Sequence, residues 1–289
     1  MNPVTKPILR VHYNFICQGK RDNVKRCSQI LQRILSTLGV YKLYHLWLRS
    51  QIDPENLPKH IGVILDGNRR WASARDMIPW QGHREGAEKV KKFLEWAHDL
   101  GITTITLYAF STENFNRSSE EVEELMKIYQ ENLAEILKTD IIHDHRVKIK
   151  FIGRTNLLPE SLGKLIEEVE AITKEYDDYY LNVALAYGGR AEIVDAAKKI
   201  AYKVKNGEIS PEDIDESVIE EHLYTSYLPQ PDPDIIIRTS GESRLSNFLI
   251  WQSAYSELFI VDVYWPEFRE IDLERAVRGF QNRHRRYGI

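Results

Sequence analysis

Residues 61–71 read IGVILDGNRRW, an apolar run followed by Asp66, Gly67, Asn68, Arg69, Arg70 and Trp71. The apolar run predicts a buried strand, so the charged and amide groups gather where that strand ends. A carboxylate can bind Mg²⁺ together with phosphate oxygens, and arginine grips phosphate with its planar fork. Glycine lets backbone N–H groups approach an anion. This stretch therefore predicts a site for a metal and a phosphate-bearing substrate at the end of a strand.

Predicted strands and helices alternate from residue 59 onward, which is typical of a mainly parallel central sheet flanked by helices. The predicted strands span residues 60–65, 103–110, 147–152, 181–186, 234–238 and 258–263. The predicted helices span residues 83–99, 118–138, 159–176, 189–205, 215–224 and 271–284, with a capping box of Ser118 and Glu121. We therefore expect an α/β fold in which ligands bind beyond the carboxyl ends of the strands.

Two further polar clusters follow predicted strands. Residues 111–117 (STENFNR) offer hydroxyls, an amide and Arg117, which suit a diphosphate near a helix N-terminus. Residues 238–247 (RTSGESRLSN) place Arg238 and Arg244 around a glycine, an arrangement that also suits a diphosphate. The simpler alternative for residues 111–117 is a solvated capping loop, and for residues 238–247 it is a surface turn. For Asp66 the alternative is a helix-capping role.

Several enzyme classes lack support in this sequence. It contains no P-loop motif, no G-x-G-x-x-G and no D-D-x-x-D motif of all-helical prenyl synthases. A haloacid-type phosphatase needs a second aspartate two residues after the first, and position 68 is asparagine. His83 opens a predicted helix and is a candidate anion contact, although a lone histidine is more often structural. Residues 187–190 (YGGR) predict chiefly a tight turn into a helix.

Composition favours an intracellular protein with a sizeable core. The chain has 289 residues, of which 43% are hydrophobic, and its two cysteines, Cys17 and Cys27, have no metal-ligand spacing. It has neither a continuous signal-peptide core nor an uncharged apolar run of membrane-spanning length. We therefore expect a cytoplasmic protein.

The charge is distributed unevenly between the N-terminal segment and the rest. Residues 1–50 hold nine Lys or Arg and one acid, a net charge of +8, which leaves −12 on residues 51–289. Residues 24–50 predict an amphipathic helix, so we expect a basic extension over residues 1–57 and a separate domain over residues 58–289. Such a segment suits an anionic membrane surface, a partner or nucleic acid. Nothing else resembles a nucleic-acid module, so we favour the membrane or a partner.

Five ordered motifs together resemble the cis-prenyltransferases, the family of undecaprenyl and dehydrodolichyl diphosphate synthases. They comprise residues 60–72, 82–83, 106–114, 187–190 and 238–252, within a similarity that runs from about residue 59 to residue 288. The resemblance implies sequential condensation of isopentenyl diphosphate with an allylic diphosphate primer. The expected primer is geranylgeranyl or farnesyl diphosphate. The product would be a long Z-polyprenyl diphosphate of the undecaprenyl type, a glycosyl carrier lipid precursor, held in a hydrophobic tunnel.

The same resemblance implies roles for individual residues. Asp66 would be the essential acid and, with Glu257, a Mg²⁺ ligand, while Asn114 is the position assigned to proton removal. The residues that would contact the two substrates are Gly67, Asn68, Arg69, Arg70, Trp71, His83, Ser111, Thr112, Glu113, Phe115, Arg117, Arg238, Arg244, Leu245 and Ser246. Arg286, in an R-x-G tail, would reach the active site of a partner subunit, so a functional homodimer is expected.

Two positions depart from bacterial members of the family. Pro79 stands where some of them have an arginine, and Arg75 is a candidate to replace that contact. Arg69 stands where those bacterial members have glycine, and in this respect the chain resembles archaeal and eukaryotic members. Apolar faces of the helices at residues 83–99 and 118–138 are expected to form the tunnel wall, with ordinary core packing as the alternative for part of them.

Two questions stay open at the level of sequence. The basic extension either docks on a membrane or packs over the tunnel mouth. A noncatalytic partner subunit of a heterodimeric prenyltransferase is the alternative function, but such subunits typically lack the acid-bearing first motif, which this chain retains.

Overall fold

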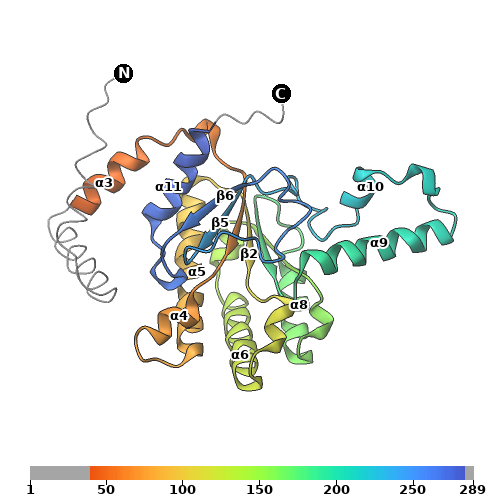
Figure 1. The fold of residues 1–289 in the computed structure, drawn as a ribbon, viewed down its shortest axis with the longest axis horizontal. Coiled ribbons are helices and arrows are strands. Elements are labelled where there is room, and N and C mark those ends of the chain that lie inside the picture. Colours follow the sequence, from red (N-terminus) through yellow and green to blue (C-terminus); the bar gives the residue numbers. More distant parts are fainter. Residues whose placement is uncertain (1–39, 284–289) are drawn as a thin grey trace. The chain divides into compact units, whose positions relative to one another are not determined.

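The chain divides into two compact units, Met1–Ile52 and Asp53–Ile289, in a computed structural model that describes residues 40–283. The second unit is built on one six-stranded sheet (Figure 1). Its strands are β1 (His60–Ile64), β2 (Thr104–Tyr108), β3 (Val147–Ile152), β4 (Tyr179–Ala184), β5 (Ile235–Thr239) and β6 (Glu257–Val261). All pair in parallel in the order β3-β4-β2-β1-β5-β6, so the predicted α/β fold and its parallel sheet are confirmed.

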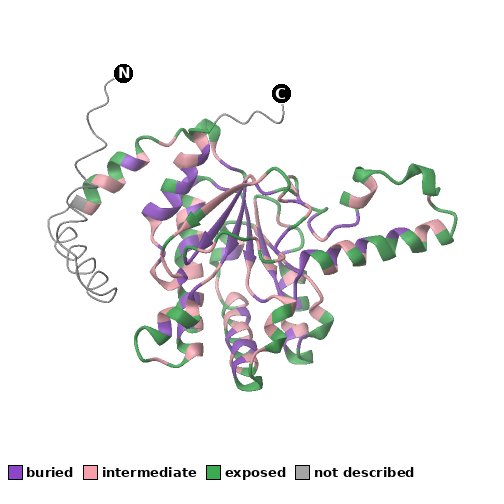
Figure 2. Cartoon of the chain, viewed as in Figure 1, coloured by how far each residue is buried: buried purple, intermediate pink, exposed green. Residues whose placement is uncertain are grey.

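The central strands owe their stability to burial on both faces. Every residue of β1 and β5 is buried, and Figure 2 shows the buried strands at the middle of the fold. Strand β6 is an edge, and none of its residues is fully buried. The polar clusters after β1, β2 and β5 therefore meet at one end of the sheet, beside its buried centre.

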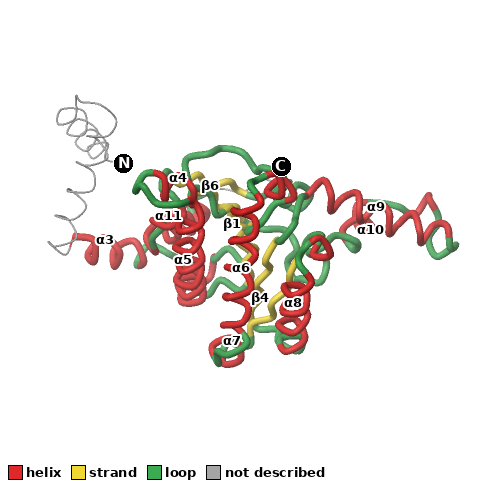
Figure 3. The backbone as a smooth tube through the Cα atoms, turned by 90° about the horizontal axis from the view of Figure 1, so that it is seen from below, coloured by secondary structure: helices red, strands yellow, loops and turns green. Residues whose placement is uncertain are grey.

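The helices of the second unit, drawn in red beside the yellow strands in Figure 3, follow the predicted alternation with some shifted boundaries. They are α4 (Asn68–Ser73), α5 (Pro79–Leu100), α6 (Ser119–Ile136), α7 (Ile141–Asp144), α8 (Glu160–Ile172), α9 (Gly189–Lys205), α10 (Glu216–Glu220) and α11 (Glu270–Gln281). Helix α4 was not predicted, and α5 begins four residues before its predicted start. Pro79 explains the early start, because its fixed φ suits the first turn of a helix and its missing N–H needs no partner there.

Glycines bring α4 and α5 into close contact beside the candidate site. A Cβ atom on Gly82 would lie 2.1 Å from the carbonyl oxygen of Asn68, and one on Gly86 would lie 2.5 Å from its Oδ1. The Trp265 indole donates a hydrogen bond to the Gly86 carbonyl over 2.8 Å. These contacts fix the turn after β1 against the rest of the fold.

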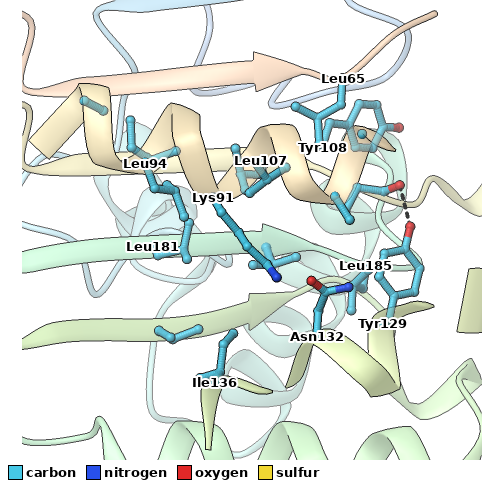
Figure 4. Close-up of a pocket in the computed structure, with 18 of the residues that line it drawn as sticks. Leu65, Lys91, Leu94, Leu107, Tyr108, Tyr129, Asn132, Ile136, Leu181 and Leu185 are labelled. Atoms are coloured by element: carbon cyan, nitrogen blue, oxygen red, sulfur yellow. Dashed lines mark hydrogen bonds between the residues drawn. The ribbon is translucent and has the colours of Figure 1, made fainter. Parts of the chain in front are cut away.

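A cavity of about 670 Å³ lies between α5, α6 and the sheet. Figure 4 shows Leu94 from α5, Ile136 from α6 and Leu107 and Leu181 from the strands lining it. Of the residues expected to form a tunnel wall, Val90, Leu94, Ala97, Leu125, Ile128, Leu133 and Ile136 line this cavity. Phe93 instead packs against the rings of Trp265 and Phe268, so it belongs to the core.

The first unit is described from residue 40, where it contains helix α3 (Val40–Arg49). The predicted boundary at residue 57 stays a prediction, as does the part of the 24–50 helix that precedes the described residues. Within residues 40–283, no helix is both long and apolar enough to cross a bilayer.

Candidate active site

Asp66 lies between two arginines at the carboxyl end of β1. Its Oδ1 accepts a hydrogen bond from Arg70 Nη2 at 3.0 Å, and its Oδ2 accepts one from Arg238 Nη2 at 2.8 Å. The Asp66 carbonyl accepts hydrogen bonds from the Thr239 hydroxyl (2.6 Å) and the Trp265 N–H (3.0 Å). Asp66 is therefore held by main chain and side chain together, and its carboxylate is oriented by guanidinium groups rather than by helix N–H groups.

The ion pairs continue from Asp66 to the loop after β5. Arg70 Nη1 donates to Glu242 Oε1 at 3.0 Å, and Arg244 Nη1 donates to Glu242 Oε2 at 2.7 Å. Three guanidinium groups therefore share two carboxylates, which leaves a net positive charge. The Asp66 and Glu242 carboxylates help raise the pKa of Arg70 against the opposing effect of its burial. This excess of positive charge suits a diphosphate.

Arg238 is the buried member of this group, with only 4% of its side chain exposed. Its Nη1 donates to Ser246 Oγ at 2.7 Å and also to the Arg244 carbonyl, while its Nε is buried without a hydrogen-bond partner. Burying a guanidinium costs free energy unless it is paired, so Asp66 is needed to hold Arg238 in place.

Gly67 is required by the turn that follows Asp66. Its φ of 105° lies in the left-handed region, and a Cβ atom there would lie 2.7 Å from the Tyr264 ring and 3.1 Å from Tyr264 Cα. The Arg70 guanidinium lies over the same ring, 5.8 Å from its centroid. Any side chain at position 67 would therefore push the turn away from its present position.

A second cluster forms around Glu121, which is nearly buried on α6. Glu121 Oε1 lies 3.0 Å from Arg117 Nη1, 3.3 Å from His83 Nε2 and 3.5 Å from Arg69 Nε. Burial and the neighbouring Arg117 lower the pKa of His83 to about 4. His83 is therefore neutral near pH 7, and two arginines against one carboxylate again leave positive charge.

Glu121 was missed by the sequence reasoning. Only half of the predicted capping box forms, because the Ser118 hydroxyl accepts from the Glu121 N–H at 3.3 Å while the Glu121 carboxylate turns to Arg117 and His83. The spacing of Arg117 and Glu121, four residues apart at a helix start, was the available signal for an ion pair.

The loop after β2 orients Asn114. Residues Thr112–Asn116 form the helical turn η2, in which the Ser111 N–H donates to Asn114 Oδ1 at 3.1 Å. Both Ser111 and Asn114 line the cavity. An amide is neutral and a poor base, so Asn114 suits hydrogen bonding to a substrate rather than proton removal by itself.

The charged clusters open directly into the apolar cavity. Its lining includes Asp66, Asn68, His83, Ser111, Asn114, Arg117 and Arg238 at this end, followed by apolar residues of α5, α6 and the strands. Tyr108 lies at the transition between the two (Figure 4), where its hydroxyl donates to the Ser246 carbonyl at 3.2 Å. The site can therefore hold an anionic head and an apolar tail in one molecule.

Some predicted site residues have other surroundings. Asn68 has its amide packed on α5, with Nδ2 donating to the Leu65 carbonyl at 3.3 Å. Leu245 packs against the core cluster that contains Phe248, and Phe115 contacts the Phe110 ring away from the main cavity.

Trp71 and Arg75, near α4, make contacts that the sequence did not predict. The Trp71 indole N–H is buried without a hydrogen-bond partner, and Arg75 stacks over the Trp71 ring at 4.3 Å. Arg75 also donates to Glu267 at 2.5 Å, so in this structure it faces α4 and η5 (Trp265–Glu267). It does not line the cavity, which argues against a replacement contact for the arginine absent at Pro79.

Glu257 lies at the start of β6, whereas Asp66 follows the end of β1. Glu257 pairs in register with Ile235, whereas Arg238, the partner of Asp66, pairs with Ile260. Ile235 and Arg238 are three residues apart on β5, so Glu257 lies about 10 Å along the strand direction from the position of Arg238. Glu257 instead lies 3.0 Å from Arg283. The role of Glu257 as a metal ligand beside Asp66 stays a prediction. Arg286 lies outside the described residues.

Asp66 fits a single divalent metal. Its carboxylate is partly exposed, and each oxygen that accepts one arginine N–H keeps a second lone pair. One protein carboxylate beside cationic groups suits Mg²⁺ bound jointly by the protein and by substrate phosphate oxygens.

Comparisons with known proteins identify the family of this chain. Residues 64–288 match the family model described as putative undecaprenyl diphosphate synthase. The chain is 55% identical to the tritrans,polycis-undecaprenyl-diphosphate synthase (geranylgeranyl-diphosphate specific) of Methanocaldococcus jannaschii, over 91% of this chain and 94% of that protein. It is 51% identical to the protein of the same name from Thermococcus kodakarensis, over 86% and 94%.

Solved structures share the fold as well. The lavandulyl diphosphate synthase of Lavandula x intermedia, in complex with dimethylallyl diphosphate, is 38% identical with a TM-score of 0.78, covering 81% of this chain and all of that one. A probable undecaprenyl diphosphate synthase from Campylobacter jejuni is 29% identical with a TM-score of 0.66, at the same coverage. The chain therefore belongs to the cis-prenyltransferase family, the undecaprenyl diphosphate synthases and their relatives, and is a transferase.

Proposed function

We propose that this protein elongates an allylic diphosphate by repeated condensation with isopentenyl diphosphate, forming a Z double bond in each cycle. The observation that carries the proposal is the junction of an arginine-rich anion site with an apolar cavity of about 670 Å³. The names of the archaeal relatives favour geranylgeranyl diphosphate as primer and an undecaprenyl-type product, a precursor of a glycosyl carrier lipid.

The two arginine clusters would hold the two diphosphates. The residues of the turn after β1, together with His83, would bind the allylic diphosphate, whose bond to carbon breaks as negative charge grows on the leaving oxygens. Arg238, Arg244 and Ser246 would hold the diphosphate of isopentenyl diphosphate. The Arg70 guanidinium, already fixed by Asp66 and Glu242, would stabilise the charge that grows on the leaving diphosphate without reorganising during the reaction.

Mg²⁺ would be bound by Asp66 with substrate oxygens, and when bound it supplies further charge neutralisation at the leaving diphosphate. The double bond of isopentenyl diphosphate attacks the allylic carbon, and a proton then leaves from the adjacent carbon. Asn114 is a neutral amide that accepts from the Ser111 N–H, so its part in that step would be to orient the substrate, and the diphosphate itself is a candidate acceptor of the proton.

The growing hydrocarbon tail would occupy the cavity between α5 and α6. Each five-carbon unit that leaves water contributes about 4 kcal/mol, at ~0.8 kcal/mol per buried carbon. This binding energy favours retention of the intermediate through successive cycles. It also makes release into water unfavourable, so we propose that the product leaves toward a membrane.

Helix α3 supports peripheral contact with an anionic membrane. Leu43, Leu46 and Trp47 are 68, 64 and 48% exposed, and Lys42 and Arg49 flank them. Apolar and basic side chains on one short helix suit the boundary of an anionic bilayer. Flotation with anionic vesicles tests this: the full chain should bind, and a chain lacking residues 1–50 should not. Equal flotation of the two would reject the membrane role.

The edge strand β6 supports a homodimer. Among residues 40–283 no strand pairs with its outer side, and Ile260 on this strand is 39% exposed. An exposed apolar edge of this kind is a natural interface for a second copy. Sedimentation should give a dimer for the wild type and a monomer for Ile260→Lys, whereas a wild-type monomer at micromolar concentration would exclude the dimer.

Incubation with labelled isopentenyl diphosphate, Mg²⁺ and either geranylgeranyl or farnesyl diphosphate tests the function directly. We expect Z-polyprenyl diphosphates near eleven isoprene units, as in the undecaprenyl chain named for the relatives, and more product from geranylgeranyl diphosphate. Failure of the pure protein to elongate either primer would reject the proposal and favour a noncatalytic partner subunit.

A further inference from the structure

Asn247 connects three loops at the edge of the candidate site. Its Nδ2 donates a hydrogen bond to Glu113 Oε1 at 3.0 Å, in the loop after β2. Its Oδ1 accepts from the Arg190 N–H at 2.9 Å, and its carbonyl accepts from the Gly189 N–H at 2.7 Å, both in the turn after β4. Asn247 itself lies in the loop after β5, one residue beyond Ser246.

The turn after β4 leaves room for this amide. A Cβ atom on Gly188 would lie 2.6 Å from Asn247 Nδ2 and 3.0 Å from Thr112 Oγ1. The φ of Gly188 is −161°, an extended backbone that any residue adopts, so glycine is needed there for space rather than for conformation. This need for space explains the glycine at position 188 in the motif at residues 187–190, which the sequence alone predicts chiefly to be a tight turn.

The loop that carries Ser246 needs external support. Ser246, Asn247 and Leu249 have φ values of 49°, 68° and 43°, all left-handed and all at residues other than glycine. Such backbone persists only where surrounding contacts fix it. The side-chain bonds of Asn247 are contacts of this kind, and they lie beside the hydroxyl of Ser246 that accepts from Arg238.

Glu113 is ionised in this arrangement. Burial opposes its ionisation, but hydrogen bonds from its own N–H and from Ser111, Asn247 and Thr112 outweigh that effect and lower the pKa of Glu113. The Asn247 amide thus meets a carboxylate, and a bond to a charged acceptor is stronger than one between neutral groups.

We propose that Asn247 is a positioning residue, which locks the loop of Ser246 and Arg244 onto the loop of Glu113 and thereby sets the affinity for isopentenyl diphosphate. The proposal rests on the function proposed above, in which that loop holds the second diphosphate. Asn247 acts through its neighbours and has no contact with the reacting atoms.

The substitution Asn247→Asp isolates the bond to Glu113. An aspartate still accepts from the Arg190 N–H, but it cannot donate to Glu113 and places a second carboxylate about 3 Å from it. We expect the KM for isopentenyl diphosphate to rise about tenfold to a hundredfold. The KM for the primer and kcat should change by less than about threefold, since Asp66 and its arginines stay in place.

Rescue by a second substitution separates positioning from general damage. In the double variant Asn247→Asp with Glu113→Gln, the new amide of residue 113 donates to the aspartate and restores the bond in the opposite direction. Its KM for isopentenyl diphosphate should fall below that of Asn247→Asp alone. This is expected even though Glu113→Gln by itself alters a predicted substrate contact.

Two matched controls are available in the chain. Asn206 Nδ2 donates to Glu208 Oε1, also at 3.0 Å, at the far end of α9, so Asn206→Asp breaks the same kind of bond away from the site. Gly188→Ala should reproduce the rise in KM by displacing the Asn247 amide. Gly163→Ala should not, because its Cβ atom would meet nothing within 4 Å.

The outcomes distinguish this inference from the proposed function. An unchanged KM in Asn247→Asp, or a rise that Glu113→Gln fails to reduce, in an enzyme whose wild type elongates normally, would overturn the positioning role. Absence of elongation by the wild type would reject the proposed function itself.

Discussion

Asp66 and Arg238 form an ion pair of 2.8 Å across the carboxyl ends of β1 and β5, with the arginine almost fully buried. The two residues are 172 positions apart in the chain and adjacent only because their strands pair in parallel. The pair thus joins the acid that would bind the metal to the arginine that would bind the second diphosphate.

Replacing Arg238 with lysine should reduce kcat/KM for isopentenyl diphosphate at least about a hundredfold. A lysine ammonium is a single point of contact, and it cannot bond Asp66 and Ser246 with the geometry of the guanidinium. Steady-state kinetics measure the effect. Arg244→Lys is the matched control, because Arg244 is 63% exposed and should lose about tenfold or less. Equal losses in both variants would contradict the special position of Arg238.

Removing the charge of Glu121 should destabilise the protein and weaken primer binding. Glu121→Gln leaves Arg117 and Arg69 without their shared carboxylate, and breaking a buried ion pair of this kind costs about 3 kcal/mol. Chemical denaturation at pH 7 measures the loss. Glu131→Gln breaks the exposed pair with Arg84 and should cost less than about 0.5 kcal/mol. A similar cost for both would show that Glu121 is not held as described.

Acid should destabilise the fold through His60. Burial lowers the pKa of His60 to about 4, whereas the unfolded chain titrates near 6.5. The unfolded state therefore binds more protons below pH 6.5, so this stability is complete above pH 6.5 and falls as the pH drops toward 4. Between pH 7 and pH 5 the loss is about 2 kcal/mol from this group.

Denaturation of wild type and His60→Gln at the two pH values measures this contribution. His60 lies 2.7 Å from Thr106 Oγ1 and 3.0 Å from the Gln230 carbonyl, contacts that an uncharged amide can reproduce in part. The variant should be less stable at pH 7 but lose less stability on going to pH 5. An identical pH dependence in both proteins would assign the acid sensitivity to other groups.

A bulky side chain in the cavity should shorten the product. Leu94 and Leu181 both line the cavity (Figure 4), so Leu94→Trp narrows the space available to the tail. We expect shorter polyprenyl diphosphates with the first condensation little affected, measured by mass spectrometry of the products. Val194→Trp, at a 47% exposed position on α9, is the control. A full-length product from Leu94→Trp would place the tail elsewhere.

Much of the fold was predictable because β1, β2 and β5 are almost wholly buried and their sequences are mainly apolar. Helix α4 was not, because its short sequence NRRWAS carries no apolar periodicity, and only its packing on Gly82 and Gly86 makes it helical. The three polar clusters were found from strand ends alone. Their meeting point followed from parallel pairing, which brings strand ends of the same polarity together.

Other parts of the site depend on tertiary contacts that no local pattern encodes. Glu121 satisfies a capping pattern, yet its carboxylate is drawn to two arginines and His83. Asn247 follows Ser246 in the motif but bonds residues of two other loops. The position of Glu257 at the start of β6 depends on strand register, which the sequence alone does not reveal.

The central claim is that Asp66 organises the site for diphosphate departure, and Asp66→Asn tests it most directly. Asparagine keeps the size of the side chain but removes the charge that holds Arg70 and Arg238 and that would bind Mg²⁺. The rate of a single condensation, measured with labelled isopentenyl diphosphate and saturating geranylgeranyl diphosphate, should fall at least about a thousandfold. A rate within tenfold of the wild type would contradict the account.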